Sequence, residues 1–398
     1  MATEARLAHV PWAALEGLAP LLEQPLKEIL DGAAAERVLD RLLRAHREFS
    51  REQRAACAES LFGVGLWRRR LRWRLDGTPL QLLAILVREL GGYVGAERAL
   101  GVELPTLRAE SDDWRVRTSF PDWIAEVFTA RFGSDAERVA NAMNTPGPVC
   151  LRARTDRDAL KAKLVEKGLE ATATRFARKG LVITTPRPNL LGLGLQGEFE
   201  VQDEGSQLLG ELVGARAGED VLDLCAGAGG KSLQLASDGA RVHATDVDLE
   251  RLERLRTRAS KSNLSVLIHG KEPPARRFDR VLVDAPCSEL GVLRRGPDMR
   301  WRIDPSILKT LPELQRSLVE KGLSYLKPGG TLVYATCTLT RGENEDVVES
   351  ILAAHPEVKR ARGDLIVDPF HDGTDGFYGA VLVVPSSTSS DRPDPSLI

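Results

Sequence analysis

The stretch of sequence that decides the fold is VLDLCAGAGGK, residues 221–231. Its apolar run is typical of a buried strand that ends at Cys225, and the glycines predict a turn before a helix that begins near Lys231. Glycine lets the backbone pass close to a ligand, so we interpret the turn as part of a binding site. A tight turn with only a structural role is the alternative, because the spacing matches neither the GxGxxG pattern nor the Walker loop.

The sequence around this turn predicts an α/β fold. From residue 218 onward, short apolar runs alternate with helical segments. The predicted strands are residues 220–225, 241–246, 265–269, 280–285, 331–336 and 376–384. Strands that alternate with helices favour an open, doubly wound, mostly parallel sheet. Sheets of this kind bind their ligands beyond the carboxyl ends of the strands.

Three polar or reactive side chains are expected at that edge of the sheet. Asp246 ends the second predicted strand, where an acidic residue about 20 positions after the glycine turn accepts hydrogen bonds from ribose hydroxyls. Asp284 ends the fourth predicted strand, and Cys337 lies just past the fifth. The sequence therefore places these residues in one predicted crevice with the glycine turn.

The rest of the chain divides into parts of different texture. The predicted parts are a helical region over residues 1–115, a small α+β domain over 116–205, the α/β domain over 206–385, and a tail over 386–398. The tail is rich in Ser and Pro, so we expect it to be disordered. Within the second part, Pro121 is expected in the first turn of a helix that Gly133 ends.

A basic stripe is expected in the helical region. WRRRLRWR, residues 67–74, contains five arginines, and Leu66, Trp67 and Leu71 would form an apolar stripe beside them on a helix. A solvated arginine face and a surface that contacts phosphates are both compatible with this pattern.

The composition limits the class of protein. The net charge of the 398 residues is only −2, so nucleic acid would have to be held by local basic patches. No run of about 18 apolar residues and no secretion signal is present, and we expect a cytoplasmic protein without a membrane segment. The five cysteines include no CxxC pair and the six histidines have no ligand spacing, so we expect neither disulfides nor a metal site.

Two further strings carry reactive residues at the same predicted edge. The first is FDRVLVDAPCSELGVLRRGPDMRWR, residues 278–302, and the second is LKPGGTLVYATCTLTRGENEDVV, residues 326–348. Together with DLCAGAGGK, these motifs resemble those of the Sun/RsmB family of RNA cytosine-5 methyltransferases. GEFEVQDEGSQL at 197–208 is also similar to that family, and the resemblance covers about residues 115–385.

The resemblance implies a fold and a reaction. The fold would be a Rossmann-like class I methyltransferase domain with a seven-stranded sheet. The reaction would be methylation of carbon 5 of cytosine in RNA, with S-adenosyl-L-methionine as the cofactor. Carbon 5 is a poor nucleophile, and addition of a thiolate to carbon 6 makes it nucleophilic, so covalent catalysis replaces one hard step by easier ones.

The resemblance also assigns roles to residues. It implies that Cys337 is the nucleophile, that Asp284 is the carboxylate at the cytosine, that Cys287 assists release of the methylated RNA, and that Lys231 lines the active site. The implied cofactor contacts are Cys225, Ala226, Gly227, Ala228, Gly229, Gly230, Lys231, Asp246 and Asp284. An attack by the second cysteine distinguishes the family from DNA cytosine-5 methyltransferases, in which the Pro-Cys cysteine attacks.

Some positions depart from the family pattern. Gly270-Lys271 stands where Gly-Asp is expected near the adenine, and Glu272 is a candidate substitute one position later. Glu289 and Thr338 replace the commoner Gly and Ser, and we expect those positions to be tolerant.

The RNA contacts are expected just after the Cys287 loop. The residues are Arg294, Arg295, Arg300, Trp301 and Arg302. Arginines beside an aromatic ring suit phosphate contacts and base stacking. In the alternative interpretation, Trp301 packs against the sheet and the arginines pair with Asp298 and Asp304.

The overall resemblance is to RsmB-type enzymes, and it favours ribosomal RNA as the substrate. Transfer RNA is the alternative substrate. An alternative from a different class is an RNA-binding assembly factor that has lost its catalysis. The only support for it is Lys271, which stands where an acidic residue is expected. We expect a monomer without a metal ion.

Overall fold

The computed structural model of the protein describes most of the chain. The described residues are 7–186, 188–190 and 192–385. The tail expected to be disordered, residues 386–398, therefore lies outside the described residues.

The chain divides into two compact units. The first, the helical unit, comprises residues 1–146 and 292–305, and the second, the sheet unit, comprises residues 147–291 and 306–398. This division crosses the boundaries expected at residues 115 and 205, and the division into three domains remains a prediction.

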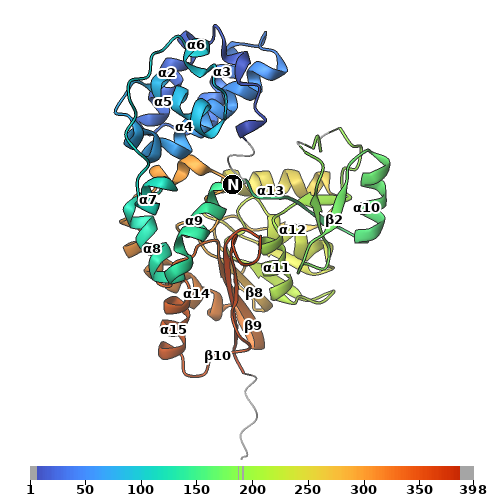
Figure 1. The fold of residues 1–398 in the computed structure, drawn as a ribbon. Helices are drawn as coiled ribbons and strands as arrows, with labels where there is room; N and C mark the ends of the chain where they lie inside the picture. The colour runs from blue at the N-terminus through green and yellow to red at the C-terminus, as the bar shows by residue number, and fades with distance from the viewer. Residues whose placement is uncertain (1–6, 187, 191, 386–398) are drawn as a thin grey trace, which may run out of the picture. The chain divides into compact units, whose positions relative to one another are not determined.

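The helical unit consists of helices, and those before residue 108 pack around one apolar core (Figure 1). Its α-helices are α2 (Ala19–Leu30), α3 (Ala35–Ala45), α4 (Arg51–Arg74), α5 (Pro79–Ile85), α6 (Ala96–Leu100), α7 (Trp114–Arg117), α8 (Asp122–Phe132) and α9 (Ala136–Asn144). Its other turns are η1 (Trp12–Leu15), η2 (Leu86–Leu90), η3 (Gly133–Asp135) and η4 (Pro297–Trp301). Gly133 ends α8 as predicted, whereas Pro121 is the N-cap of α8 and lies one position before its first turn.

Helix α4 contains the basic stripe that the sequence predicts. Ser50 and Gln53 form a capping box at its start, and its apolar side chains pack against α2 and α3. Leu66, Trp67 and Leu71 are buried, as expected for the apolar stripe. Ion pairs join Arg69 to Asp122, Arg70 to Glu110 and Arg74 to Glu89.

The segment 292–305 follows the Cys287 loop in sequence but belongs to the helical unit. The amide of Ala35, the first residue of α3, donates to the Asp298 carboxylate at 3.1 Å. The positive end of the helix dipole favours a negative charge at this position. Arg300 is 0% exposed, lies 3.7 Å from the centre of the Phe120 ring, and donates to Asn144 Oδ1 at 2.7 Å. These contacts anchor the segment in the core of the helical unit.

A small antiparallel sheet begins the sheet unit. Its strand order is β2-β3-β1-β4, and its elements are β1 (Val149–Ala153), α10 (Arg157–Glu166), β2 (Ala171–Ala173), β3 (Gly180–Ile183) and β4 (Phe199–Val201). Leu151 and Leu181 form its core with Leu160 and Leu164 of α10. This confirms the fold class expected for this region, a small α+β unit.

The main sheet contains all six strands that the sequence predicts. Its strands are β5 (Asp220–Asp223), β6 (Arg241–Ala244), β7 (Val266–Ile268), β8 (Phe278–Asp284), β9 (Leu326–Thr336), β10 (Lys359–Arg360), β11 (Leu365–Val367) and β12 (Phe377–Val383). Its helices are α11 (Glu204–Val213), α12 (Gly230–Ser237), α13 (Leu249–Lys261), α14 (Ile307–Ser324) and α15 (Glu345–Ala354).

The strand order confirms a doubly wound sheet. Seven strands follow the order β10-β12-β9-β8-β5-β6-β7, and β11 pairs with β12 in addition. The strands from β7 to β9 are parallel to their neighbours, and β12 is antiparallel to β9. The chain leaves β5 for β6 and β7 and returns to β8 on the other side, so the switch point lies between β5 and β8, where such sheets bind ligands.

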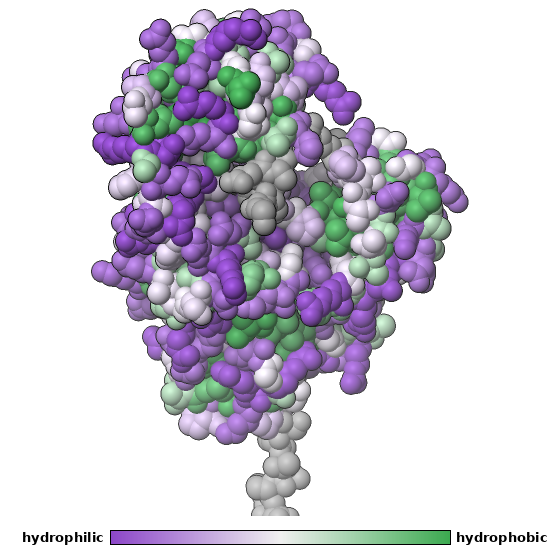
Figure 2. Space-filling view, in the orientation of Figure 1, coloured by the Kyte–Doolittle hydropathy of each residue, from purple (hydrophilic) through white to green (hydrophobic). Residues whose placement is uncertain are grey.

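Helices cover both faces of this sheet (Figure 1). Val281 and Val283 pack against Gly322 of α14 on one face, and Gly379 of β12 packs against Leu209 and Leu212 of α11 on the other. On the side of the molecule in Figure 2, hydrophilic residues predominate and hydrophobic ones are scattered in small groups. Among the described residues, no helix combines the length and the apolar character needed to cross a bilayer.

Candidate active site

A pocket of about 650 Å³ lies at the carboxyl ends of β5, β6, β8 and β9. Its lining includes all of the predicted catalytic and cofactor-binding residues, namely Cys225, Ala226, Gly227, Ala228, Gly229, Gly230, Lys231, Asp246, Asp284, Cys287 and Cys337. The structure thus brings together residues from four strand ends at the switch point.

The glycine turn between β5 and α12 presents backbone to this pocket. Gly227 and Gly229 have φ angles of +54° and +87°, which glycine adopts without strain. A Cβ atom at Gly229 would lie 2.1 Å from Leu255 Cδ1 of α13. Only glycine fits there, and the first N–H groups of α12 consequently border the pocket.

Asp246 is held in a fixed orientation beside the turn. Its Oδ2 accepts from the amide of Gly227 at 2.8 Å, and its Oδ1 accepts from the amide of Asp248 at 2.8 Å. Each carboxylate oxygen retains a lone pair, so the group can still accept hydrogen bonds from the hydroxyls of a sugar.

Lys231 and Asp284 form an ion pair at the centre of the pocket. The Lys231 ammonium donates to Asp284 Oδ2 at 2.7 Å, and the lysine is 9% exposed. Burial alone would lower the pKa of Lys231, but the attraction and hydrogen bond of Asp284 outweigh it and raise the pKa. The lysine therefore remains charged and fixes the Asp284 carboxylate.

The two cysteines are neighbours although they are far apart in sequence. The sulfur atoms of Cys287 and Cys337 lie 3.3 Å apart, because parallel strands β8 and β9 end side by side. The hydrogen bond with Cys287 is the main cause that raises the pKa of Cys337 well above its ordinary 9.0, followed by burial and the negative charges of Glu289 and Asp284. Without a ligand, Cys337 is therefore a neutral thiol.

The outer part of the pocket contains the position that departs from the family pattern. Lys271 and Glu272 both line the pocket, and Glu272 pairs with Lys321 of α14 at 2.7 Å. Leu314 and Leu318, one helical turn apart on α14, supply apolar surface nearby. The pocket therefore combines backbone donors, an oriented carboxylate and an apolar wall, and these features fit a nucleoside.

Comparisons with known proteins agree with this geometry. Residues 212–383 match the family described as 16S rRNA methyltransferase RsmB/F, and residues 120–189 match the ferredoxin-like domain of RsmF/B-like methyltransferases. Ribosomal RNA small subunit methyltransferase B of Erwinia tasmaniensis is 35% identical over 316 residues, which cover 74% of this chain and 73% of the relative. The chain belongs to the RsmB/F methyltransferase family.

Solved structures show the same fold as this RsmB/F family member. A methyltransferase homolog protein from Pyrococcus horikoshii is 27% identical, with a TM-score of 0.60, over 68% of this chain and 97% of that one. NSun6 from the same organism, solved with SFG, has a TM-score of 0.60 over 67% of this chain and 99% of that one. At 18% identity, the second likeness concerns the fold alone.

The residues predicted to contact RNA do not line the pocket. Arg300 is fully buried against Phe120 and Asn144, so the structure gives it a structural role instead of the predicted RNA contact. Arg302 pairs with Asp298 at 3.2 Å, as the alternative interpretation expects. Arg294 is half-buried and Arg295 is exposed.

Within the helical unit, Trp301 packs under an arginine of the basic stripe. The Arg68 guanidinium lies 4.3 Å from the centre of its ring. Leu30, Arg68, Arg69, Arg72 and Trp301 line a hollow of about 280 Å³ in the helical unit. Within the described part of the chain, neither Arg68 nor Arg72 forms an ion pair with a carboxylate, unlike Arg69, Arg70 and Arg74.

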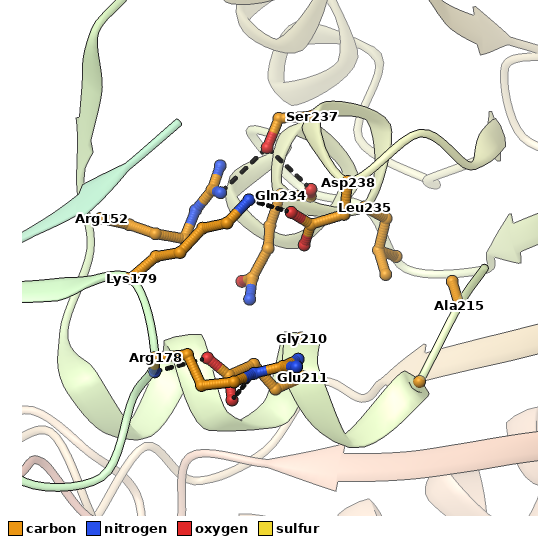
Figure 3. Close-up of a pocket in the computed structure, with 11 residues that line it drawn as sticks. Arg152, Arg178, Lys179, Gly210, Glu211, Ala215, Gln234, Leu235, Ser237 and Asp238 are labelled. Carbon is orange, nitrogen blue, oxygen red and sulfur yellow. Dashed lines mark hydrogen bonds and ion pairs between the residues drawn. The ribbon is translucent and has the colours of Figure 1, made fainter. Parts of the chain in front are cut away.

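A second hollow in the sheet unit is not part of the candidate active site. It has a volume of about 410 Å³ and lies between the small sheet and helices α11 and α12 (Figure 3). Four of its charged groups form two ion pairs, Arg178 with Glu211 and Lys179 with Asp238. Arg152 donates to Ser237 at 2.9 Å and thereby joins the small sheet to α12.

Some residues of the site did not emerge from the sequence. Glu343, in the turn between β9 and α15, is 1% exposed and accepts hydrogen bonds from residues beside both cysteines. It lies within the quoted ENEDVV string but had no assigned role. Asp248, the N-cap of α13, also lines the pocket, and its position two residues after Asp246 was the available signal.

Proposed function

We propose that this RsmB/F family member transfers a methyl group from S-adenosyl-L-methionine to carbon 5 of cytosine in small-subunit ribosomal RNA. The observation that supports the reaction most directly is the pair of cysteine sulfurs 3.3 Å apart beside the Lys231–Asp284 ion pair. The names of the curated relatives support the choice of ribosomal RNA.

The residues of the pocket fit the cofactor. Asp246 would accept from the ribose hydroxyls, the glycine turn would approach the sugar and the amino-acid part, and Leu314 and Leu318 would contact the base. When bound, the cofactor supplies an electrophilic methyl group on a positively charged sulfur. A cation in the pocket also favours the thiolate form of Cys337.

The chain's own groups would perform the remaining chemistry. The Cys337 thiolate adds to carbon 6 of the flipped cytosine, and the ring electrons make carbon 5 nucleophilic. The Asp284 carboxyl group would lie at ring nitrogen 3, where a proton shared between the two groups neutralises the negative charge that develops on the ring as the adduct forms. After methylation, the carbon 5 proton passes to the Cys287 sulfur or to solvent, the electrons of the broken C–H bond restore the carbon 5–carbon 6 double bond, and Cys337 leaves carbon 6 as a thiolate.

The test is methylation of RNA with a tritiated methyl group and analysis for 5-methylcytosine. Cys337→Ala should abolish incorporation, whereas Cys287→Ala should leave protein covalently attached to RNA on a denaturing gel. Cys57→Ala, in the core of the helical unit, is the control. Normal methylation by the Cys337→Ala protein would overturn the assignment of the nucleophile.

Two alternatives remain testable in the same preparation. Bisulfite sequencing of total RNA with and without the gene distinguishes ribosomal from transfer RNA. Lys271 in the outer pocket is the single observation that favours a vestigial factor. Calorimetry with the cofactor decides this point, because a vestigial factor would show no binding.

A contact with RNA is also proposed for the helical unit. Arg68 and Arg72 lie beside Trp301 and form no ion pair with a carboxylate in the described part of the chain, and guanidinium groups beside an aromatic ring suit contact with a phosphate and a base. This assigns RNA contact to Arg68, Arg72 and Trp301 rather than to the buried Arg300.

A further inference from the structure

Glu343 is a buried carboxylate that does not line the pocket. It lies in the turn between β9 and α15, at 1% exposure. Among the residues that the structure describes, no Lys, Arg or His forms an ion pair with it. A buried carboxylate is costly unless hydrogen bonds satisfy it, so the surroundings of Glu343 must provide donors.

The donors come from the loops that contain the two cysteines. Glu343 Oε2 accepts from the amide of Ser288 at 2.9 Å, and Oε1 accepts from the Ser288 hydroxyl at 2.5 Å. On the other loop, Oε1 accepts from the hydroxyls of Thr340 at 2.8 Å and Thr338 at 3.3 Å. Ser288 follows Cys287 directly, and Thr338 follows Cys337 directly.

A third element closes the network. Gln315 of α14 donates to Glu343 Oε2 at 3.0 Å and to the carbonyl oxygen of Pro286 at 2.8 Å. The hydroxyls of Ser288 and Thr338 also lie 2.7 Å apart. One carboxyl group therefore joins both cysteine loops and the helix behind them, and the replacement of one of its acceptor oxygens by a donor would loosen all three together.

We propose that Glu343 is a positioning residue that sets the separation of Cys287 and Cys337. The proposal rests on the roles proposed above for the two cysteines. One thiol has to bond carbon 6 while the other acts at the same base, so their relative position matters more than the position of either alone. Glu343 acts on both through Ser288 and Thr338.

The variant that tests this is Glu343→Gln, which keeps the shape but presents an NH₂ group to donors. We expect kcat for RNA methylation to fall about 100-fold, as for a misplacement of roughly 1 Å, while KM for RNA and for the cofactor changes little. The matched control is Glu349→Gln, which removes an exposed carboxylate of α15 that pairs with Arg341.

A second readout does not depend on methylation. Diamide oxidises two neighbouring thiols to a disulfide and takes up the two electrons and two protons that they lose. Because the sulfurs lie 3.3 Å apart, the wild-type protein should form the Cys287–Cys337 disulfide rapidly, and Glu343→Gln should form it roughly tenfold more slowly or worse. Peptide mapping identifies the bond, and the Cys287→Ala protein gives the background.

The outcomes separate this proposal from the proposed function. A wild-type disulfide rate in folded Glu343→Gln overturns the positioning role, whether or not the protein methylates RNA. Slow disulfide formation with unchanged kcat overturns its importance for the reaction. If Glu343→Gln does not fold, Ser288→Ala removes the 2.5 Å hydrogen bond to Glu343 and the 2.7 Å contact with the Thr338 hydroxyl, keeps the other donors to Glu343, and should show the same effects at smaller size.

Discussion

At the scale of the residue, the proposed mechanism depends on the proton of the Cys337 thiol. The thiol has a raised pKa because Cys287 hydrogen-bonds with it, because it is buried, and because Asp284 and Glu289 are negatively charged. In the proposed mechanism the reactive species is the thiolate, so this pKa would have to fall when the cofactor and the RNA bind. The sequence motifs identified both cysteines but did not reveal the raised pKa of Cys337. That pKa depends on the distance between the two loops that contain the cysteines.

The first prediction concerns the pH dependence of adduct formation. The thiolate fraction increases about tenfold for each pH unit below the pKa, so single-turnover kcat/KM should rise with pH to beyond pH 9.0. Cys287→Ala removes the main cause that raises the Cys337 pKa. The adduct that this variant accumulates should therefore form with a profile displaced to lower pH, and identical profiles would contradict the structure.

The second prediction concerns Glu289, a position that we expected to be tolerant. Its φ angle is +58°, in the left-handed region that costs a residue with a Cβ about 1–2 kcal/mol. Glu289→Gly should raise the free energy of unfolding by up to about 1 kcal/mol, after the entropy of the unfolded glycine chain is subtracted. Urea titration measures this, and Glu289→Ala should show no comparable gain.

At the scale of the element, the backbone after Cys287 passes between two other strand ends. The amide of Gly291 donates to the carbonyl oxygen of Cys337 at 2.9 Å, and the amide of Gly376 donates to the carbonyl oxygen of Gly291 at 2.7 Å. This close contact explains why a glycine, Gly291, stands four residues after Cys287. A side chain at Gly291 would push the backbone away from Cys337 and Gly376. The apolar periodicity predicted the strands themselves, but it contains no information about this contact between loops.

The third prediction follows from that contact. A Cβ at Gly291 would lie 2.1 Å from the carbonyl oxygen of Gly376, so Gly291→Ala should cost about 1–3 kcal/mol of stability and reduce methylation. Gly296→Ala is the matched control, because its nearest neighbour would be Met299 Cβ at 3.8 Å. Thermal denaturation and a methylation assay would show equal behaviour of the two variants if the contact were unimportant.

At the scale of the whole molecule, the sheet could be predicted from the sequence, whereas the division into three domains stays a prediction. Strands and helices of the α/β region follow local periodicity, so β5, β8 and β9 and the switch point could be predicted. That residues 292–305 belong to the helical unit could not be predicted from the sequence. Their position depends on contacts of Asp298 with α3 and of Arg300 with α9, and both helices are far away in sequence. For the same reason Arg300 was mistaken for a surface residue.

The fourth prediction separates the structural arginine from those proposed to bind RNA. Arg300→Ala should lower the free energy of unfolding by roughly 2–4 kcal/mol, through a cavity beside Phe120 and an unpaired Asn144. It should leave the affinity of the folded protein for RNA unchanged.

Arg72→Ala should preserve stability. It should reduce the slope of the logarithm of the RNA-binding constant against the logarithm of the salt concentration by about 0.7–0.9. Filter binding at several salt concentrations, with thermal denaturation, measures both effects, and an unchanged slope for Arg72→Ala would remove that contact.

The placement of residues 292–305 has a consequence for truncation of the chain and for the exchange of its parts between related proteins. A fragment that ends at residue 146 would leave the amide of Ala35 without Asp298 and the ring of Phe120 without the Arg300 guanidinium. The two halves of the gene therefore cannot be exchanged as independent cassettes. A graft of the N-terminal region onto another methyltransferase would have to bring with it a piece of sequence that is encoded inside the catalytic half.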